Sequence, residues 1–274
     1  MIIEWNAHMF SSDTERYPFH PRAAYTRDAS RWEVDPVEAY TKRLEDEGID
    51  RAVLVHPEPY GDDHRLVLDC VAKNPDRFKA TSLFYPKDKD APSKLTDLVA
   101  EHPEIVATRF HKHRGKEMYL DSFADSGVRA LWEKAAELGL VVELHIGPDH
   151  AAGCEDLILA HAETPVLIDH LAEPHKEDAV EYADVLGLAR FENVCMKLSG
   201  LNHFSNDEPL YENARPFTRR VVEAFGPDQL VWGSGTPGIV EVHMPDHSDS
   251  DRAKVLGGNV ARLLGWAVGE ARDQ

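Results

Sequence analysis

The sequence is poor in cysteine, and it contains no long apolar run. Its three cysteines, Cys70, Cys154 and Cys195, lie far apart and form no Cys-x-x-Cys pattern, which argues against a disulfide framework or a thiolate metal site. No apolar run approaches the roughly 18 residues of a transmembrane helix, and no basic segment leads into an apolar one near the start. We therefore expect a protein of the reducing cytoplasm with no membrane span.

Positive charge is also scarce. The 274 residues contain 30 Lys and Arg against 49 Asp and Glu, a formal net charge of −19. Nucleic acids and anionic membrane surfaces attract basic proteins, so neither is an expected partner. The 42% content of apolar residues is enough for a folded core. We expect a small-molecule substrate, with assembly into a homo-oligomer left open.

Eight β-branched or apolar runs alternate with amphipathic helical stretches along the chain. This alternation predicts parallel strands with right-handed crossovers, and a length near 274 residues is typical of a single (β/α)8 TIM barrel, which usually has about 250. A doubly wound open sheet is the competing topology. No linker divides the sequence, so we expect one domain over residues 1–274. The predicted strands are 2–10, 51–56, 78–84, 105–111, 140–145, 166–170, 194–199 and 230–232.

Helix signals fill the gaps between these runs. Asp35 followed by Pro36 marks one helix start, and Gly48 marks its end. The segment 11–33 is too long for an ordinary connection, so we expect a loop over the active-site face of the barrel. The predicted helices are 35–48, 62–74, 93–102, 126–139, 153–162, 177–190, 211–225 and 251–264.

Barrel enzymes place their chemistry at the carboxyl ends of the strands, which restricts the candidates to few polar residues. Because side chains alternate along a strand, Glu4, Asn6 and His8 are predicted to share one face. His8, His145 and His170 are predicted to converge on one mouth. Glu143 is either functional or a buried carboxylate paired with Lys197 or Arg109. The predicted substrate-binding residues are Tyr60, Arg109, His111, Lys197, Ser199 and His203.

The ordered motifs resemble the TIM-barrel amidohydrolase superfamily, in particular its amidohydrolase-2 branch, which includes 2-pyrone-4,6-dicarboxylate lactonase. The resemblance runs from about residue 2 to about residue 266. It rests on EWNAHMF (4–10), VLVHPxxYG (53–61), NPxRF (74–78), ELG (137–139), VELH (142–145), IDHL (168–171), KLSGL (197–201), LVWGSGTP (230–237) and GNVARL (258–263).

Two positions depart from the family pattern. The first strand has Asn6 where the family usually has a histidine, and the last strand motif has Gly235 where the family has an aspartate that serves as base or metal ligand. Three explanations stay open: a variant from which the carboxylate was removed, a natural member with its base elsewhere, or a barrel that binds without hydrolysing. Glycine would also suit a strand end that needs backbone room.

The resemblance implies a hydrolase that opens a small carboxylated lactone by attack of water. His8, His145 and His170 would then be catalytic, with Glu143 or Glu58 as base. Arg109 and Lys197 would hold a substrate carboxylate. Either no cofactor is required or one Zn²⁺ or Mn²⁺ is bound, with His8 and His145 as ligands.

Two other functions remain as alternatives. The chain could be a metal-dependent decarboxylase of the same superfamily, or a barrel that binds a ligand without turnover. The segment 241–249 is interpreted as an acidic surface loop that could lend His243 or Asp246 to the site.

Overall fold

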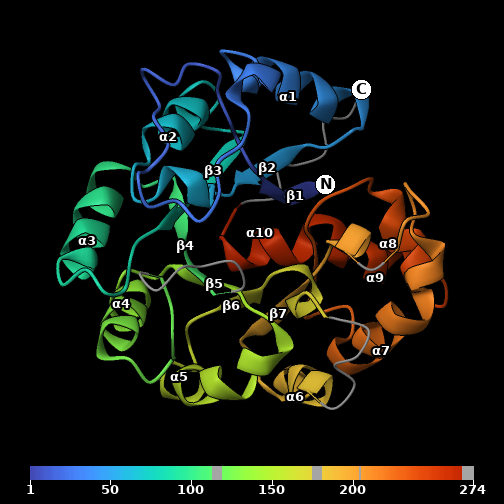
Figure 1. Ribbon diagram of the computed structural model, residues 1–274. Coiled ribbons are helices and arrows are strands. Elements are labelled where there is room, and N and C mark those ends of the chain that lie inside the picture. The colour runs from blue at the N-terminus through green and yellow to red at the C-terminus, as the bar shows by residue number, and fades with distance from the viewer. Residues whose placement is uncertain (113–118, 175–180, 204, 267–274) are drawn as a thin grey trace.

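The computed structural model describes residues 1–112, 119–174, 181–203 and 205–266. Its eight parallel strands follow one another around the sheet in sequence order (Figure 1), and β8 lies against β1, so the sheet curls into a nearly closed barrel. The predicted TIM barrel is thus confirmed, and the open sheet is excluded. The strands are β1 (Ile3–Ala7), β2 (Arg51–Leu54), β3 (Phe78–Leu83), β4 (Ile105–His111), β5 (Val141–His145), β6 (Val166–Ile168), β7 (Val194–Leu198) and β8 (Leu230–Trp232).

Helices surround this barrel (Figure 1). The first begins as predicted, because the Asp35 side chain accepts a hydrogen bond from the Val37 amide and Pro36 occupies its first turn. Gly48, with a φ of +67°, follows its end. The helices are α1 (Pro36–Asp46), α2 (Arg65–Ala72), α3 (Ala91–Glu101), α4 (Ser126–Glu137), α5 (Glu155–Ala160), α6 (Glu181–Gly187), α7 (Arg215–Phe225), α8 (Gly238–His243), α9 (Asp249–Ala253) and α10 (Asn259–Leu263).

The prediction was wrong in the last part of the chain. Residues 241–249 were interpreted as a loop, but 241–243 complete α8, a helix too short for a periodic signal. The single helix predicted over 251–264 is divided by a π-helical turn at Lys254–Gly258. The predicted helix start at residue 177 lies outside the described residues. None of the helices in the described ranges has the length and apolarity to cross a membrane.

Two packed regions support the barrel. Inside it, Ile3, Trp5, Val53 and Val231 belong to one buried apolar cluster, and a larger cluster fills the space between the strands and the surrounding helices. Such layers of branched side chains make a barrel interior a solid core rather than a pore. The polar side chains of the site therefore stand on a rigid apolar base.

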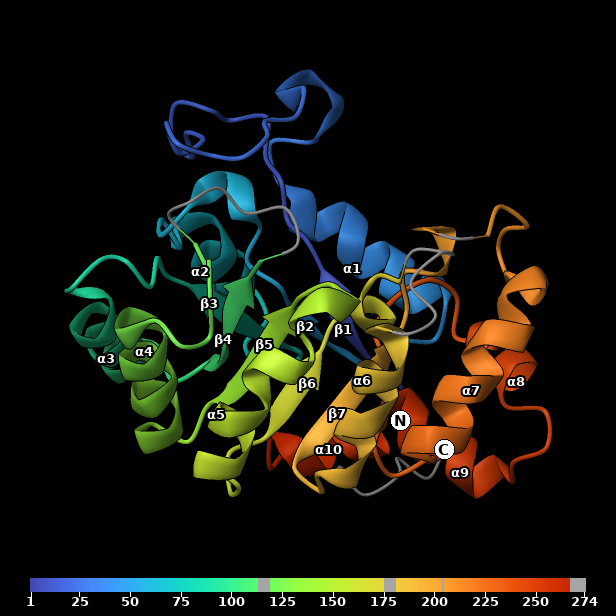
Figure 2. The ribbon, with the colours of Figure 1, turned by 60° about the horizontal axis from the view of Figure 1, so that its bottom comes forward.

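The long first loop stands above the barrel, as predicted (dark blue in Figure 2). Hydrogen bonds fix it at several points: the Ser11 hydroxyl donates to the Val34 carbonyl at 2.6 Å, the His20 amide to the Pro59 carbonyl at 2.7 Å, and the Ala24 amide to the Glu58 carboxylate at 2.7 Å. The last two of these bonds tie the loop to the segment that follows β2.

Candidate active site

A cavity of about 190 Å³ lies at the carboxyl ends of the strands, under the first loop. It brings together seven residues predicted from sequence as catalytic or substrate-binding: His8, Glu58, Arg109, His111, His145, His170 and His203. These residues come from six different parts of the barrel, so the predicted convergence on one mouth is observed. The other lining residues are Asn6, Phe10, Tyr25, Arg27, Glu173, Gly200, Asn202 and Ser234.

The predicted common face of the first strand does not include Glu4. The register of β1 against β2 shifts between Trp5 and Ala7, so a bulge interrupts the alternation of side chains. Glu4 faces α1, where its carboxylate accepts hydrogen bonds at 2.7 Å from Tyr40 and Arg43. Asn6 and His8, beyond this irregularity, line the cavity.

Four buried charges form the floor of the cavity, and we call them the ion network: Arg109, Glu143, Asp169 and Lys197. Arg109 donates twice to Asp169, at 2.9 and 2.5 Å. Lys197 lies between the carboxylates of Glu143, at 2.6 Å, and Asp169, at 2.7 Å. No side chain of this set is more than 3% exposed. The predicted pairing of Glu143 with Lys197 is therefore confirmed.

The two carboxylates of the network differ in basicity. Burial, together with the neighbouring charge of Asp169, raises the pKa of Glu143 to about 7. Burial acts in the same direction on Asp169, but the charges of Lys197 and Arg109 outweigh it and hold the pKa of Asp169 well below its usual range. Asp169 is therefore the more acidic of the two carboxylates, and the two cations of the ion network pair with two carboxyl groups.

This arrangement corrects two predicted roles. Lys197 was expected to hold a substrate carboxylate, yet its ammonium is fully buried and occupied by Glu143 and Asp169. Glu143 was expected as a base, yet it is fully buried beneath the cavity, and its second oxygen accepts a hydrogen bond from Trp5 at 3.3 Å. Arg109 does reach the cavity wall, but its guanidinium is already paired with Asp169.

His8 has one ring nitrogen fixed by the backbone. Its Nδ1 lies 2.8 Å from the Val55 carbonyl, which can only accept, so Nδ1 carries the proton and Nε2 keeps a lone pair. Burial, and after it the charge of Arg109, lowers the pKa of His8 to about 3. At neutral pH the ring is therefore an uncharged hydrogen-bond acceptor at the cavity.

A second chain of polar contacts crosses the cavity wall. His145 Nε2 lies 2.7 Å from a Glu173 carboxylate oxygen, and His145 Nδ1 lies 3.0 Å from His111 Nε2. With no ion bound, His145 Nε2–H donates a hydrogen bond to the carboxylate, and Nδ1 accepts one from His111. With an ion on Nε2, the ring proton would lie on Nδ1 and be donated to His111 Nε2. Burial, followed by the charge of Arg109, lowers the pKa of His145 to about 4. The neutral ring is the form that binds metal ions.

His170 and Glu173 owe their placement to an unusual turn after β6. All four residues from His170 to Glu173 have positive φ, between 39° and 59°, a conformation that costs about 1–2 kcal/mol for each residue other than glycine. Buried packing of Leu171 and Ala172 holds the turn, and Tyr182 donates a hydrogen bond to the Leu171 carbonyl at 3.0 Å. The turn brings both polar side chains to the cavity, where strain commonly marks a functional site.

His170 is further fixed by β7 and the residues after it. Its Nδ1 lies 2.9 Å from the Ser199 hydroxyl. Ser199, which was predicted to bind substrate, thus supports the His170 ring. Gly200, with a φ of +71°, leaves room for the ring, since a Cβ there would lie 2.6 Å from the His170 Cβ. The His170 Nε2 is left to face other partners.

His145, His170 and Glu173 could together hold a metal ion. One ligand atom from each lies within 4.8 Å of the others, and all three residues are buried. Two imidazoles and a glutamate are a ligand set of catalytic zinc sites, so the residues fit a divalent ion. The predicted ligand His145 belongs to this set, whereas the predicted ligand His8 does not.

Several other predicted residues lie away from the cavity wall. Tyr60 is buried and accepts a hydrogen bond from the Ser11 amide at 3.2 Å, so it supports the first loop. His243 bonds to Thr218 and to the Leu210 carbonyl inside the helical layer, and Asp246 is exposed. Glu58 does line the cavity, while one of its oxygens anchors the loop at Ala24.

The glycine of the last strand motif has a conformation that favours glycine. Gly235 has a φ of +92°, and a Cβ there would lie 2.7 Å from the end of the Ile239 side chain. The aspartate of the family pattern would be strained in this backbone. Its neighbour Ser234 is the residue of this motif that lines the cavity.

Sequence reasoning missed two residues of the site, Tyr25 and Arg27. Asp169 and Glu173, at the end of the sixth predicted strand, are among the polar candidates that position alone indicates, but neither was assigned a role. Tyr25 and Arg27 lie in the middle of the first loop, where no periodic pattern applies. Only the predicted placement of that loop over the mouth pointed to them.

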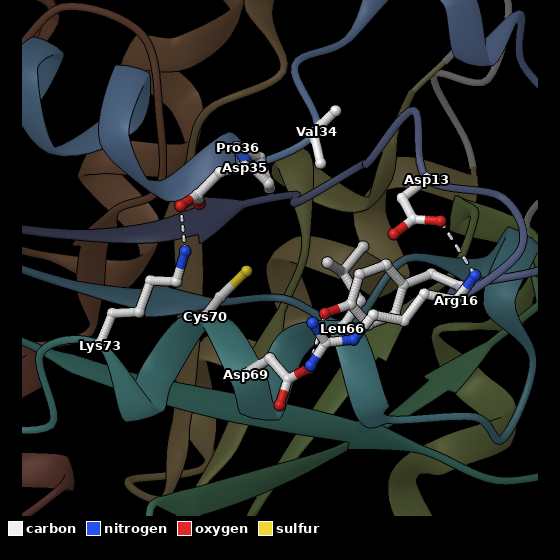
Figure 3. Close-up of a pocket in the computed structure, with 10 residues that line it drawn as sticks. Asp13, Arg16, Val34, Asp35, Pro36, Leu66, Asp69, Cys70 and Lys73 are labelled. Atoms are coloured by element: carbon white, nitrogen blue, oxygen red, sulfur yellow. Dashed lines mark hydrogen bonds and ion pairs between the residues drawn. The ribbon is translucent and has the colours of Figure 1, made fainter.

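A second cavity, of about 370 Å³, lies between the first loop and helices α1 and α2 (Figure 3). Its charged groups are paired with one another: Arg16 with Asp69 at 2.6 Å, and Lys73 with Asp35. All four of these side chains are more than two-fifths exposed, so the pairs are surface ion pairs. This cavity lies away from the strand ends, and we do not assign the chemistry to it.

Comparisons with known proteins identify the family of the chain. A family model described as amidohydrolase matches residues 5–266. A 4-sulfomuconolactone hydrolase of Rhizobium radiobacter is 29% identical over 280 residues, covering 95% of this chain and 89% of the relative. A 2-pyrone-4,6-dicarboxylate hydrolase of Comamonas testosteroni is 26% identical over 258 residues, covering 89% and 79%.

Among solved structures, a probable 2-pyrone-4,6-dicarboxylic acid hydrolase from Acinetobacter baumannii with citric acid bound superposes with a TM-score of 0.76. Its sequence identity is 20%, and the match covers 96% of this chain and 99% of that one. At this identity the likeness establishes the fold.

Proposed function

The chain belongs to the amidohydrolase family, as its motifs predicted, and from that membership we propose that it opens a small carboxylated lactone by attack of water. The named relatives that support this are hydrolases of lactones, and the candidate site lies where barrel enzymes place their chemistry. A single barrel hosts many reactions, so the argument depends on the site itself.

One observation carries the proposal: a fixed hydrogen-bond acceptor and a potential electrophile face the same small cavity. The acceptor is His8 Nε2, and the electrophile is a divalent ion held by the His145, His170 and Glu173 set. Ester hydrolysis requires both functions, because the attacking water loses a proton while negative charge develops on the carbonyl oxygen.

We assign proton transfer to His8. Its Nε2 takes a proton from the water as the oxygen attacks the lactone carbonyl, and the same nitrogen returns the proton to the ring oxygen as the carbon–oxygen bond breaks. The charge of Arg109 contributes to the low pKa of the free imidazole. Negative charge on the substrate would offset it, so His8 becomes more basic when a proton must be accepted.

The ion-binding set supplies the second function. When bound, a zinc ion would act as a Lewis acid for the developing oxyanion. His145 offers a ring whose other nitrogen faces His111, and His170 one whose other nitrogen faces Ser199, so each ligand is oriented by a neighbour. The floor of paired charges beneath holds these strand ends in place.

This assignment favours one of the three explanations for Gly235. A backbone with a φ of +92° suits a natural glycine, and His8 supplies an acceptor elsewhere in the cavity. We therefore interpret the chain as a natural family member with its base on the first strand.

A ring-opening assay tests the proposed function. The zinc-loaded protein is incubated with a panel of small carboxylated and uncharged lactones in water labelled with heavy oxygen. We expect a product that contains one added water, with the label in one carboxylate oxygen. No opening of any lactone, or loss of carbon dioxide from an aromatic acid instead, would contradict the proposal.

The ion-binding set has a separate test. Glu173→Gln removes one charged ligand at constant size, so we expect the zinc content after dialysis to fall from about one ion per chain to well below that, and ring opening to fall with it. Glu101→Gln, at an exposed position of α3, is the matched control and should change neither quantity. An unchanged zinc content in Glu173→Gln would refute this ligand set.

A further inference from the structure

The cations beneath the cavity are not available to a substrate. Arg109 is paired with Asp169, Lys197 lies between Glu143 and Asp169, and these side chains are at most 3% exposed. A substrate carboxylate could pair with either cation only by leaving a buried carboxylate without its partner, which costs several kcal/mol. Recognition of an acidic group therefore needs another cation.

Arg27 is the other cation of the cavity wall. Among the described residues that line the cavity, only Arg27 and Arg109 are Arg or Lys. Arg27 is exposed, and no ion pair joins it to a carboxylate within the described part of the chain. The carboxylate next to it in sequence, Asp28, is paired instead with Arg31 at 3.4 Å.

Aromatic rings hold the Arg27 guanidinium at the mouth. Its central carbon lies 5.3 Å from the centre of the Phe10 ring and 5.7 Å from that of Tyr25, and both rings line the cavity. Stacking on rings positions the flat guanidinium while its N–H edges stay available for a planar anion. Trp32 stacks on Phe10, with the two ring centres 4.6 Å apart.

We propose that Arg27 recognises the carboxylate of the substrate and so makes this enzyme selective for acidic lactones. This inference rests on the proposed function of the same cavity. The chain carries a net charge of −19, and Glu58 and Glu173 line the cavity, so an anionic substrate gains from a cation at the entrance. The first loop would then determine the substrate class, while the strand ends provide the reaction.

Binding of a matched ligand pair tests the role of Arg27. The probes are 3-oxocyclopentane-1-carboxylate and its primary carboxamide, which have the shape of a five-membered lactone, cannot be opened by water, and differ in charge. Their dissociation constants are measured by calorimetry on the zinc-loaded full chain at low ionic strength. The variants are Arg27→Gln, Arg27→Lys and, as a control on the same loop, Arg31→Gln.

We expect Arg27→Gln to weaken binding of the carboxylate by about 10- to 100-fold, the range for a hydrogen bond to a charged group, and to change binding of the carboxamide less than about 2-fold. Arg27→Lys should be intermediate, because it keeps the charge but loses the fork. Arg31→Gln should bind both probes as the wild type does.

Other results would overturn the inference. These are equal weakening of both probes by Arg27→Gln, no preference of the wild type for the carboxylate, or no binding of either probe. Failure of the proposed function is distinguishable, because a protein that binds the carboxylate through Arg27 without opening any lactone would retain this inference and lose the reaction.

Discussion

The two arginines of the cavity wall differ in burial and in the groups that they contact. Arg109, on β4, is 3% exposed and forms hydrogen bonds to Asp169, as part of a set in which two cations match two carboxylates. Arg27, on the first loop, is exposed and stacks on aromatic rings. The comparison shows that burial determines what each arginine can do. The buried Arg109 neutralises a buried carboxylate and stabilises the fold, whereas the exposed Arg27 can bind a ligand.

The floor and the mouth should therefore respond differently to substitution. Removal of one member of a buried pair leaves its partner as an uncompensated charge in a medium of low polarity. Removal of an exposed charge leaves only solvated groups, and the stability of the fold changes little. The variants below test this difference between the buried ion network and the exposed charges.

Lys197→Met should have the largest effect. It leaves Glu143 and Asp169 with only Arg109 nearby, and we expect the free energy of unfolding in urea to fall by about 3–5 kcal/mol. Lys42→Met removes a surface ion pair to Asp46 and should cost under about 1 kcal/mol. Equal losses of unfolding free energy in the two variants would show that the buried ion network contributes no more to stability than a surface ion pair.

Gly235→Asp should have an intermediate effect. A φ of +92° and the close Ile239 side chain predict a loss of about 1–3 kcal/mol in the free energy of unfolding. Because our account places the base at His8, this variant should open lactones no faster than the wild type. A large gain in the rate of ring opening would instead identify the chain as a form disabled at this position.

Much of the fold could be predicted from sequence, because hydrophobic alternation reports which segments are buried and at which period. All eight strands occur where apolar runs predicted them. The pairing of Glu143 with Lys197 was one of the alternatives predicted from charge, beside pairing with Arg109 or a functional role. The common face of Glu4, Asn6 and His8 was not, because the bulge in β1 depends on the pairing with β2 and leaves no mark on the sequence.

The position of Glu173 at a strand end made it a candidate, but its role could not be assigned from the sequence for a related reason. The residue follows His170 by three positions, and only a left-handed turn of four residues brings both side chains to one cavity. No glycine marks this turn, so composition gives no signal. Arg27 was missed because the position of a loop residue over the cavity depends on the hydrogen bonds that fix the loop to the barrel, and the sequence does not show them.

Glu4→Gln should have the smallest effect, outside both regions. Burial raises the pKa of Glu4 from 4.5 to about 7 against the opposing charge of Arg43, so between these pH values the folded state keeps a proton that the unfolded state has released. The stability of the wild type therefore falls as pH rises through this window. Gln cannot titrate.

The two proteins should thus be nearly equal in stability at pH 4.5, and the variant should be more stable at pH 7, by on the order of 1 kcal/mol. Urea unfolding at both pH values measures the difference. Ring opening should be unaffected, because Glu4 faces α1. A variant that is less stable than the wild type at pH 7 would show that the Arg43 pair outweighs burial.

The most direct test of the account is the rate of lactone opening by His8→Asn at matched zinc content. The Asn amide can still donate to the Val55 carbonyl from the position of Nδ1, while the acceptor at Nε2 is lost. We predict that kcat falls by about 10²- to 10⁴-fold, with the zinc content unchanged. A variant that opens the lactone at the wild-type rate would contradict the assignment of the reaction to this cavity's acceptor.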